Sequence, residues 1–268
     1  DQPIKLDASD NAGNSMSEYK KDIDSTINVD RYAPEITNIE RTPEYVTDNY
    51  INKDINISFN ATDLMSGIRS VRLVRVENGV EKEEINLKSS GDDDSSRSYT
   101  GAIIRNGTYR IIAVDKVGHE SEPDAESGTE FTVSDIDKER PSELNIEVDK
   151  STAVVVNGIY TSSDPITLNI TAKDIENTEA GYARSGIASF EIFNVYDDKD
   201  DLLKSGVWSD ISAETEKIEH TFTSGTYQLK LVVRDNAGNE KTWTADSSFT
   251  VQNQVPELTY NIVTSGVT

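Results

Sequence analysis

The chain has 268 residues, of which 35% are apolar, and its 49 acidic against 26 basic side chains give a net charge of −23. This length has room for about two domains, and the negative charge repels nucleic acids and anionic membranes, so we expect no nucleic-acid partner. The absence of cysteine excludes disulfides, thiolate metal sites and cysteine nucleophiles. No apolar run reaches the eighteen or so residues of a membrane span, so we expect no membrane insertion by this segment.

The first residues contain a phrase that returns twice further along the chain. "SDNAGN" at 9–14 is similar to "VDKVGH" at 114–119 and to "RDNAGN" at 234–239. Self-similarity at long intervals indicates tandem repeats. Residues 1–33 are therefore predicted to be the C-terminal hairpin fragment of a preceding repeat.

A proline marks the beginning of each repeat, at Pro34, Pro141 and Pro256. These positions predict a first domain over 34–134, a linker over 135–140 and a second domain over 141–252. Residues 253–268 are predicted to be a linker and the first strand of a further repeat.

Each repeat has the pattern of short strands. In "DINISFNATD" (54–63) and "PITLNITAKD" (165–174) apolar residues alternate with polar ones, which is typical of half-buried strands. "YRIIAVD" (109–115) and "YQLKLVVRD" (227–235) continue this alternation. Six or seven such strands between turn clusters predict an all-β chain of tandem immunoglobulin-like β-sandwich domains.

Two tyrosines indicate which kind of sandwich this is. Tyr109 and Tyr227 follow a Gly-Thr pair at the start of the penultimate strand. Immunoglobulin-like domains carry there a tyrosine whose hydroxyl bonds back to the backbone, so we expect both residues to form such a corner.

The order of these motifs resembles a known family. "TDLMSGI", "NGTY", "DKVG" and an exit strand before proline resemble the bacterial immunoglobulin-like tandem repeats of Gram-positive cell-surface proteins, over residues 34–252. The resemblance implies a secreted or cell-wall-attached stalk that serves adhesion or spacing, without catalysis. Two features depart from the family: the linker "SDIDKERP", and His119 where asparagine is expected.

The recurring acids have a turn interpretation. Asp115 and Asp235 can accept backbone N–H groups in Asx turns, and Gly238 supplies the positive φ that such a reversal needs. Asp63 and Asp174 also end a strand before a turn. We expect all four to shape bends rather than to bind a ligand.

Two acidic runs are candidate calcium loops. An EF-hand that begins at Asp197 in "DDKDD" would need glycine at position 202 and glutamate at 208, where the sequence has Leu202 and Trp208. We therefore expect 197–201 and "GDDD" (91–94) to be solvated hairpin turns.

The linker offers the one metal site that we predict. Asp135, Asp137 and Glu139 could bind Ca²⁺ between two sandwich domains and stiffen the joint. An exposed acidic linker without a metal is the alternative interpretation.

Catalytic and glycan-binding functions have less support. The two histidines, His119 and His220, cannot be paired with a nucleophile by spacing, so we expect no catalytic residues, no cofactor and no enzyme activity. Carbohydrate binding would need exposed aromatic rings, for which Trp208, Trp243, Tyr160 and Tyr182 are candidates. A tryptophan in a sandwich usually packs in the core or at an edge, and this is the interpretation that we favour.

The sequence therefore predicts a non-catalytic structural or adhesive stalk segment of a bacterial cell-surface protein, extracellular and monomeric. Its partner would be a protein or glycan on a host or cell surface. The alternatives are a carbohydrate-binding accessory module of a surface enzyme and a calcium-stiffened adhesin repeat.

Overall fold

The computed structural model describes residues 2–3, 10–12, 26–27, 29–43, 49–91, 93–161, 164–210 and 213–253. The chain divides into two compact units, Asp1–Val46 with Asp54–Ser134, and Thr47–Lys53 with Asp135–Thr268. Residues 135–140 thus belong to the second unit. A parallel bridge between Ile51 and Ile136 pairs them with the short segment before β4.

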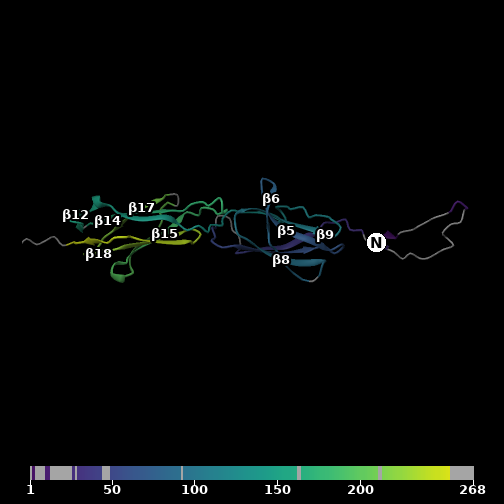
Figure 1. The fold of residues 1–268 in the computed structure, drawn as a ribbon, viewed down its shortest axis with the longest axis horizontal. Coiled ribbons are helices and arrows are strands. Elements are labelled where there is room, and N and C mark those ends of the chain that lie inside the picture. The colour runs from purple at the N-terminus through teal and green to yellow at the C-terminus, as the bar shows by residue number, and fades with distance from the viewer. Residues whose placement is uncertain are drawn as a thin grey trace, which may run out of the picture. The chain divides into compact units, whose positions relative to one another are not determined.

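The first unit is a sandwich of two four-stranded sheets (Figure 1). One sheet has the order β3 (Glu35–Thr42), β4 (Ile55–Thr62), β8 (Ser96–Ile103), β7 (Lys88–Ser90). The other has the order β10 (Glu130–Val133), β9 (Gly107–Asp115), β5 (Ile68–Glu77), β6 (Val80–Ile85). All neighbours are antiparallel. This is the strand order of an immunoglobulin-like sandwich with one extra edge strand, β6.

The second unit repeats this plan with its edges divided differently. One sheet has the order β11 (Ser142–Val148), β14 (Ile166–Lys173), β17 (Thr215–His220). The second has the order β16 (Asp201–Val207), β15 (Ile187–Asn194), β19 (Leu229–Asp235), β20 (Glu240–Thr244). A third has the order β12 (Val154–Val156), β13 (Ile159–Thr161), β21 (Phe249–Val251), β18 (Gly225–Tyr227). The predicted all-β, immunoglobulin-like fold class is confirmed.

The two ends of the chain are described only in part. β1 (Gln2–Pro3) pairs antiparallel with β2 (Thr26–Ile27), where the sequence predicts a terminal hairpin. Most of the remaining residues up to 28, and the predicted strand after Pro256, lie outside the described residues. No helix in the described ranges is long and apolar enough to cross a membrane.

The predicted alternation of buried and solvated side chains is confirmed. Ile55, Ile57 and Phe59 on β4 are buried while the residues between them are more exposed, and β14 repeats the pattern from Ile166 to Ala172. In the second unit these side chains form one cluster with apolar residues of β15 and β19. Both sheets therefore contribute to the core, as the sandwich requires.

Both predicted tyrosine corners are confirmed. The Tyr109 hydroxyl donates to the Arg105 carbonyl at 2.7 Å, and the Tyr227 hydroxyl donates to the Thr223 carbonyl at 2.9 Å. Burial raises the pKa of Tyr109 to about 12. Each hydroxyl fixes the turn that precedes its strand.

Tyr227→Phe is expected to lower the free energy of unfolding of the second unit by about 1 kcal/mol, because a buried ring loses its only polar anchor. Urea denaturation followed by circular dichroism measures this loss. Tyr196→Phe, at an exposed ring of the same unit, is the control and should change stability little. Equal losses in the two variants would contradict the corner assignment.

Candidate functional site

Among the described residues, two groups of titratable side chains have ligand atoms within 4.8 Å of one another. They are Asp30, Asp115 and His119 in the first unit, and Asp137, Asp174 and Asp235 in the second. In the sequence repeat Asp30 corresponds to Asp137, and Asp115 to Asp235. Each group combines the residue four positions before the first-strand proline with the aspartate that ends the β9 or β19 strand. The two groups are therefore versions of one place in the fold.

The turn after β9 is built around the Asp115 carboxylate. Asp115 Oδ1 accepts from the backbone N–H of Val117 at 2.9 Å and of His119 at 2.8 Å, and also from that of Gly118. Gly118 has a φ of 106°, which side chains with a Cβ resist. The predicted turn role of Asp115 is confirmed.

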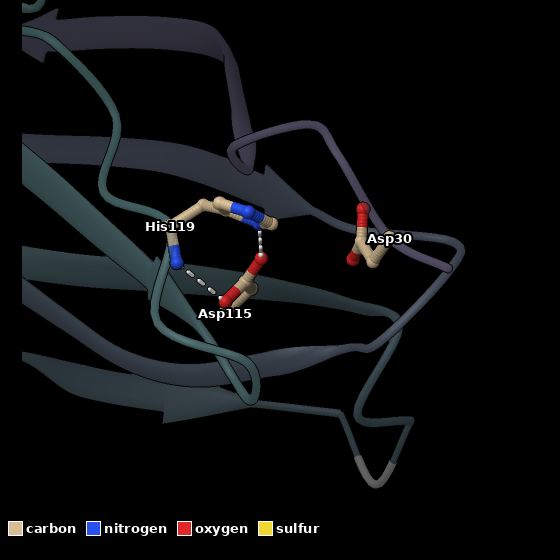
Figure 2. Close-up of side chains that lie close together, drawn as sticks. All are labelled: Asp30, Asp115 and His119. Atoms are coloured by element: carbon tan, nitrogen blue, oxygen red, sulfur yellow. Dashed lines mark hydrogen bonds and ion pairs between the residues drawn. The ribbon is translucent and has the colours of Figure 1, made fainter. Parts of the chain in front are cut away.

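His119 gives the first group an internal partner for its buried acid. His119 Nδ1 lies 2.7 Å from Asp115 Oδ2 (Figure 2). Burial opposes the ionised form of Asp115, but hydrogen bonds from the side chain and backbone of His119 and from Gly118 outweigh it and hold the pKa below its usual value. The fully buried carboxylate of Asp115 is thus compensated by its own turn.

Asp30 and Asp63 are also satisfied by backbone amides. Asp30 Oδ1 accepts from the N–H of Tyr32 and Oδ2 from that of Ser66, each at 3.1 Å, and the hydrogen bonds, that with Ser66 foremost, lower the pKa of Asp30. Asp63 Oδ1 accepts from three successive amides, those of Met65, Ser66 and Gly67, at 2.9–3.0 Å. The predicted turn role of Asp63 is confirmed.

Asp235 forms the matching turn in the second unit. Its Oδ1 accepts from the Asn239 backbone N–H at 2.8 Å, and its Oδ2 accepts from Asn239 Nδ2 at 2.9 Å. Gly238 has a φ of 87°, as predicted. Asn239 stands where the first unit has His119, so here the partner of the buried acid is an amide that cannot take a positive charge.

Asp137 repeats the contacts of Asp30. Its Oδ1 accepts from the Glu139 N–H and its Oδ2 from the Ser185 N–H, each at 3.0 Å. Ser185 and Gly186 match Ser66 and Gly67 in the repeated "SGI" phrase. Burial is the main cause that raises the pKa of Asp137.

Asp174 has fewer hydrogen-bond partners than Asp63, which ends the matching strand of the first unit. Its Oδ2 accepts from the Gly186 N–H and lies 3.4 Å from Ser185 Oγ, while its Oδ1 is buried with no hydrogen-bond partner. Burial, followed by the charges of Asp137 and Asp235, raises the pKa of Asp174 to about 6, although Arg184 opposes this shift. The second group is therefore an undercompensated cluster of buried negative charge.

The three predicted linker ligands do not lie in one group. Asp137 belongs to the buried cluster, whereas Glu139 Oε1 accepts from Asn177 Nδ2 at 2.6 Å. Asp135 is buried, and its carbonyl accepts from the Ile51 N–H. Asp174 and Asp235, which we interpreted as turn residues only, are the acids that accompany Asp137.

Trp208 is a core residue, as expected for a tryptophan in a sandwich, so the sugar-stacking alternative fails for this ring. It is 3% exposed, packs edge-on against Phe190, and donates from Nε1 to the Ala213 carbonyl at 2.9 Å. Tyr160 is also buried, and Trp243 packs partly against the same core. Trp208 and Tyr160 therefore present no exposed ring to a sugar.

The remaining candidates have structural roles. Residues 197–200 connect the antiparallel strands β15 and β16, and Asp201 begins β16. Gly91, Asp93 and Asp94 lie between the antiparallel strands β7 and β8, as predicted for hairpin turns. His220 packs on Phe222 at 4.6 Å between ring centroids, and burial lowers its pKa. Among the described residues, neither imidazole forms a hydrogen bond with a serine or threonine hydroxyl.

Comparison with known proteins finds only remote similarity to solved structures. No family model matches the chain, and no curated protein sequence matches it. Domains from titin align at 12% identity and a TM-score of 0.43, over 82% of this chain and 67% of theirs.

Two further solved structures are similarly remote. The FN1–FN3 domains of chicken CNTN1 align at 14% identity and a TM-score of 0.36, over 82% of this chain and 65% of theirs. A tetra-tandem repeat in the extending region of a large adhesion protein aligns at 16% identity and a TM-score of 0.30, over 90% of this chain and 54% of that one. This chain therefore spans about half to two thirds of each neighbour, and its fold assignment rests on the strand topology described above.

Proposed function

We propose that this chain is a non-catalytic stalk segment of a bacterial cell-surface protein, which extends or presents another part of that protein outside the cell. The observation that carries the proposal is the internal use of the repeated polar residues. Asp115, Asp235, Asp63 and both corner tyrosines bond to the chain's own backbone. Residues repeated for the sake of turns are what a spacer needs.

The strand pairing of the second unit favours a role under tension. β13 runs parallel to β21, with Ile159 opposite Thr250 and Tyr160 opposite Val251. Gln252 extends the pair by donating its N–H to the Tyr160 carbonyl at 2.9 Å. When the early strand and the late strand of a unit are parallel neighbours, pulling on its two ends shears their hydrogen bonds together rather than one after another.

The Gln252→Pro variant tests this role, because proline removes the donor and leaves the neighbouring strands in place. Single-molecule pulling on the whole chain is expected to show a lower unfolding force for the second unit and about fivefold faster unfolding, equivalent to about 1 kcal/mol. The force of the first unit should stay the same.

Gln252→Ala is the matched control, since it keeps the N–H and changes only an exposed side chain. Its unfolding force should equal that of the parent. Units that open at the lowest measurable force in the parent chain, or a Gln252→Pro force equal to that of the control, would contradict the proposal.

A further inference from the structure

We infer that the second unit holds one calcium ion between Asp137, Asp174 and Asp235, and that the corresponding place in the first unit does not need one. This inference does not depend on the stalk function. It revises the ligand set predicted from the linker, because Asp174 and Asp235 replace Asp135 and Glu139.

The second unit concentrates negative charge in its interior. The three carboxylates offer ligand atoms within 4.8 Å of one another, and the residues are 0%, 3% and 3% exposed. No ion pair among the described residues involves any of the three. Buried charges of one sign are unfavourable unless a counter-charge accompanies them.

One oxygen of the cluster gives an independent sign of a missing ligand. Every other carboxylate oxygen of the cluster accepts a hydrogen bond, but Asp174 Oδ1 is buried and has no partner. Native proteins rarely leave a buried acceptor unsatisfied, and a bound ion is one of the ordinary explanations. This oxygen belongs to Asp174, one of the three carboxylates whose ligand atoms lie within 4.8 Å of one another.

The donor atoms of the cluster indicate which cation would bind. The donors are carboxylate oxygens without thiolate or imidazole, which suits a hard cation rather than zinc or copper. Ca²⁺ accepts six to eight oxygens at irregular geometry, whereas Mg²⁺ keeps several of its waters. Three buried carboxylates from three segments can supply several ligands directly from the protein, which favours calcium over magnesium.

The corresponding acids of the first unit are satisfied by the chain itself. There His119 lies against Asp115 (Figure 2). Three amides satisfy Asp63, which is not part of the close group. In the second unit Asn239 replaces the imidazole, and the longer loop between Asp174 and Ser185 gives Asp174 fewer amides. In the first unit the chain's own groups compensate the buried carboxylates, whereas in the second unit we expect a cation to do so.

Calorimetric titration of the whole chain with calcium chloride, after chelator treatment and dialysis, tests the inference. We expect one site per chain. We also expect the melting temperature to rise by about 10 °C when calcium is about 100-fold above its dissociation constant. Magnesium should bind more weakly.

Asp174→Asn and Asp137→Asn are each expected to weaken calcium binding by about tenfold or more, because each removes one charged ligand. Asp63→Asn, at the matching position of the first unit, should leave both affinity and stoichiometry unchanged. Melting in chelator shows independently that each variant is folded.

Three results would overturn the inference. The first is a parent chain with neither heat of binding nor a thermal shift at millimolar calcium. The second is Asp174→Asn binding calcium as the parent does. The third is a site that prefers magnesium.

Discussion

Trp208→Ala is expected to lower the free energy of unfolding of the second unit by about 3–5 kcal/mol. The ring is almost completely buried and packs edge-on against Phe190, with centroids 6.4 Å apart. Alanine would leave a cavity between β15 and the segment after β16. It would also leave the Ala213 carbonyl without the indole N–H that it accepts now.

Urea denaturation followed by far-ultraviolet circular dichroism measures the effect without relying on the fluorescence of the residue that is removed. Leu202→Ala is the control, because Leu202 is an apolar side chain of the same unit that is 54% exposed. Its loss should stay below about 0.5 kcal/mol. A Trp208→Ala loss as small as this would mean that the tryptophan is not a core residue.

Asp174→Asn is expected to stabilise the cation-free second unit at pH 7 by about 2 kcal/mol, the opposite sign to most substitutions of buried polar groups. Asparagine has the same shape but removes one of three adjacent negative charges. Its amide nitrogen can also replace the unpartnered Oδ1 and donate to a neighbouring carboxylate. Calcium should reduce this advantage, because it stabilises the parent more than the variant.

The pH dependence of this effect has a definite sign. Burial and the neighbouring acids raise the pKa of Asp174 from 3.8 to about 6, so the folded chain binds its proton more tightly than the unfolded chain does. Protonation of Asp174 then favours folding at low pH, and this contribution to the stability of the second unit falls as the pH rises from about 4 through about 6. The advantage of Asp174→Asn should therefore shrink toward pH 4.

Thermal melts of both proteins in chelator, from pH 4 to 7.5, measure this difference. Asp63→Asn is the control in the first unit and should bring no gain, because the Asp63 carboxylate is already satisfied by three amides. If Asp174→Asn were less stable than the parent at pH 7 in chelator, the second cluster would not be electrostatically strained.

The strands and turns were predictable because their causes are local. Alternation fixes which side chains of β4 and β14 face the core, and positive φ at Gly118 and Gly238 follows from a reversal of the chain after an aspartate. Tyr109 and Tyr227 bond to carbonyls four residues before them, so their roles also depend on short stretches of sequence.

The acidic cluster was not predictable by the same means. Asp174 and Asp235 each have a sufficient explanation as turn residues, and only the sandwich brings them beside Asp137. A usable signal was present in the repeat, since an aspartate recurs before the first strand and at the ends of the same two strands in both units. The signal that distinguishes the units is the exchange of His119 for Asn239.

Trp208 was a candidate for sugar stacking, as an alternative to packing in the core, for a simple physical reason. Its neighbours in "SGVWSDIS" are polar and small, which is typical of an exposed loop. Trp208 follows the last residue of an edge strand, β16, and its backbone N–H donates to the Ala188 carbonyl at 2.8 Å. That contact turns the ring toward the core, and no local pattern encodes it.

The most direct test of the account is a crystal structure of the chain grown with calcium, with the anomalous signal measured to locate the ion. The account predicts an ion bonded at about 2.3–2.6 Å to carboxylate oxygens of Asp137, Asp174 and Asp235. It also predicts that His119 still bonds directly to Asp115, with no ion between Asp30 and Asp115. An ion in the first group with an empty second group, or ions in neither, would contradict it.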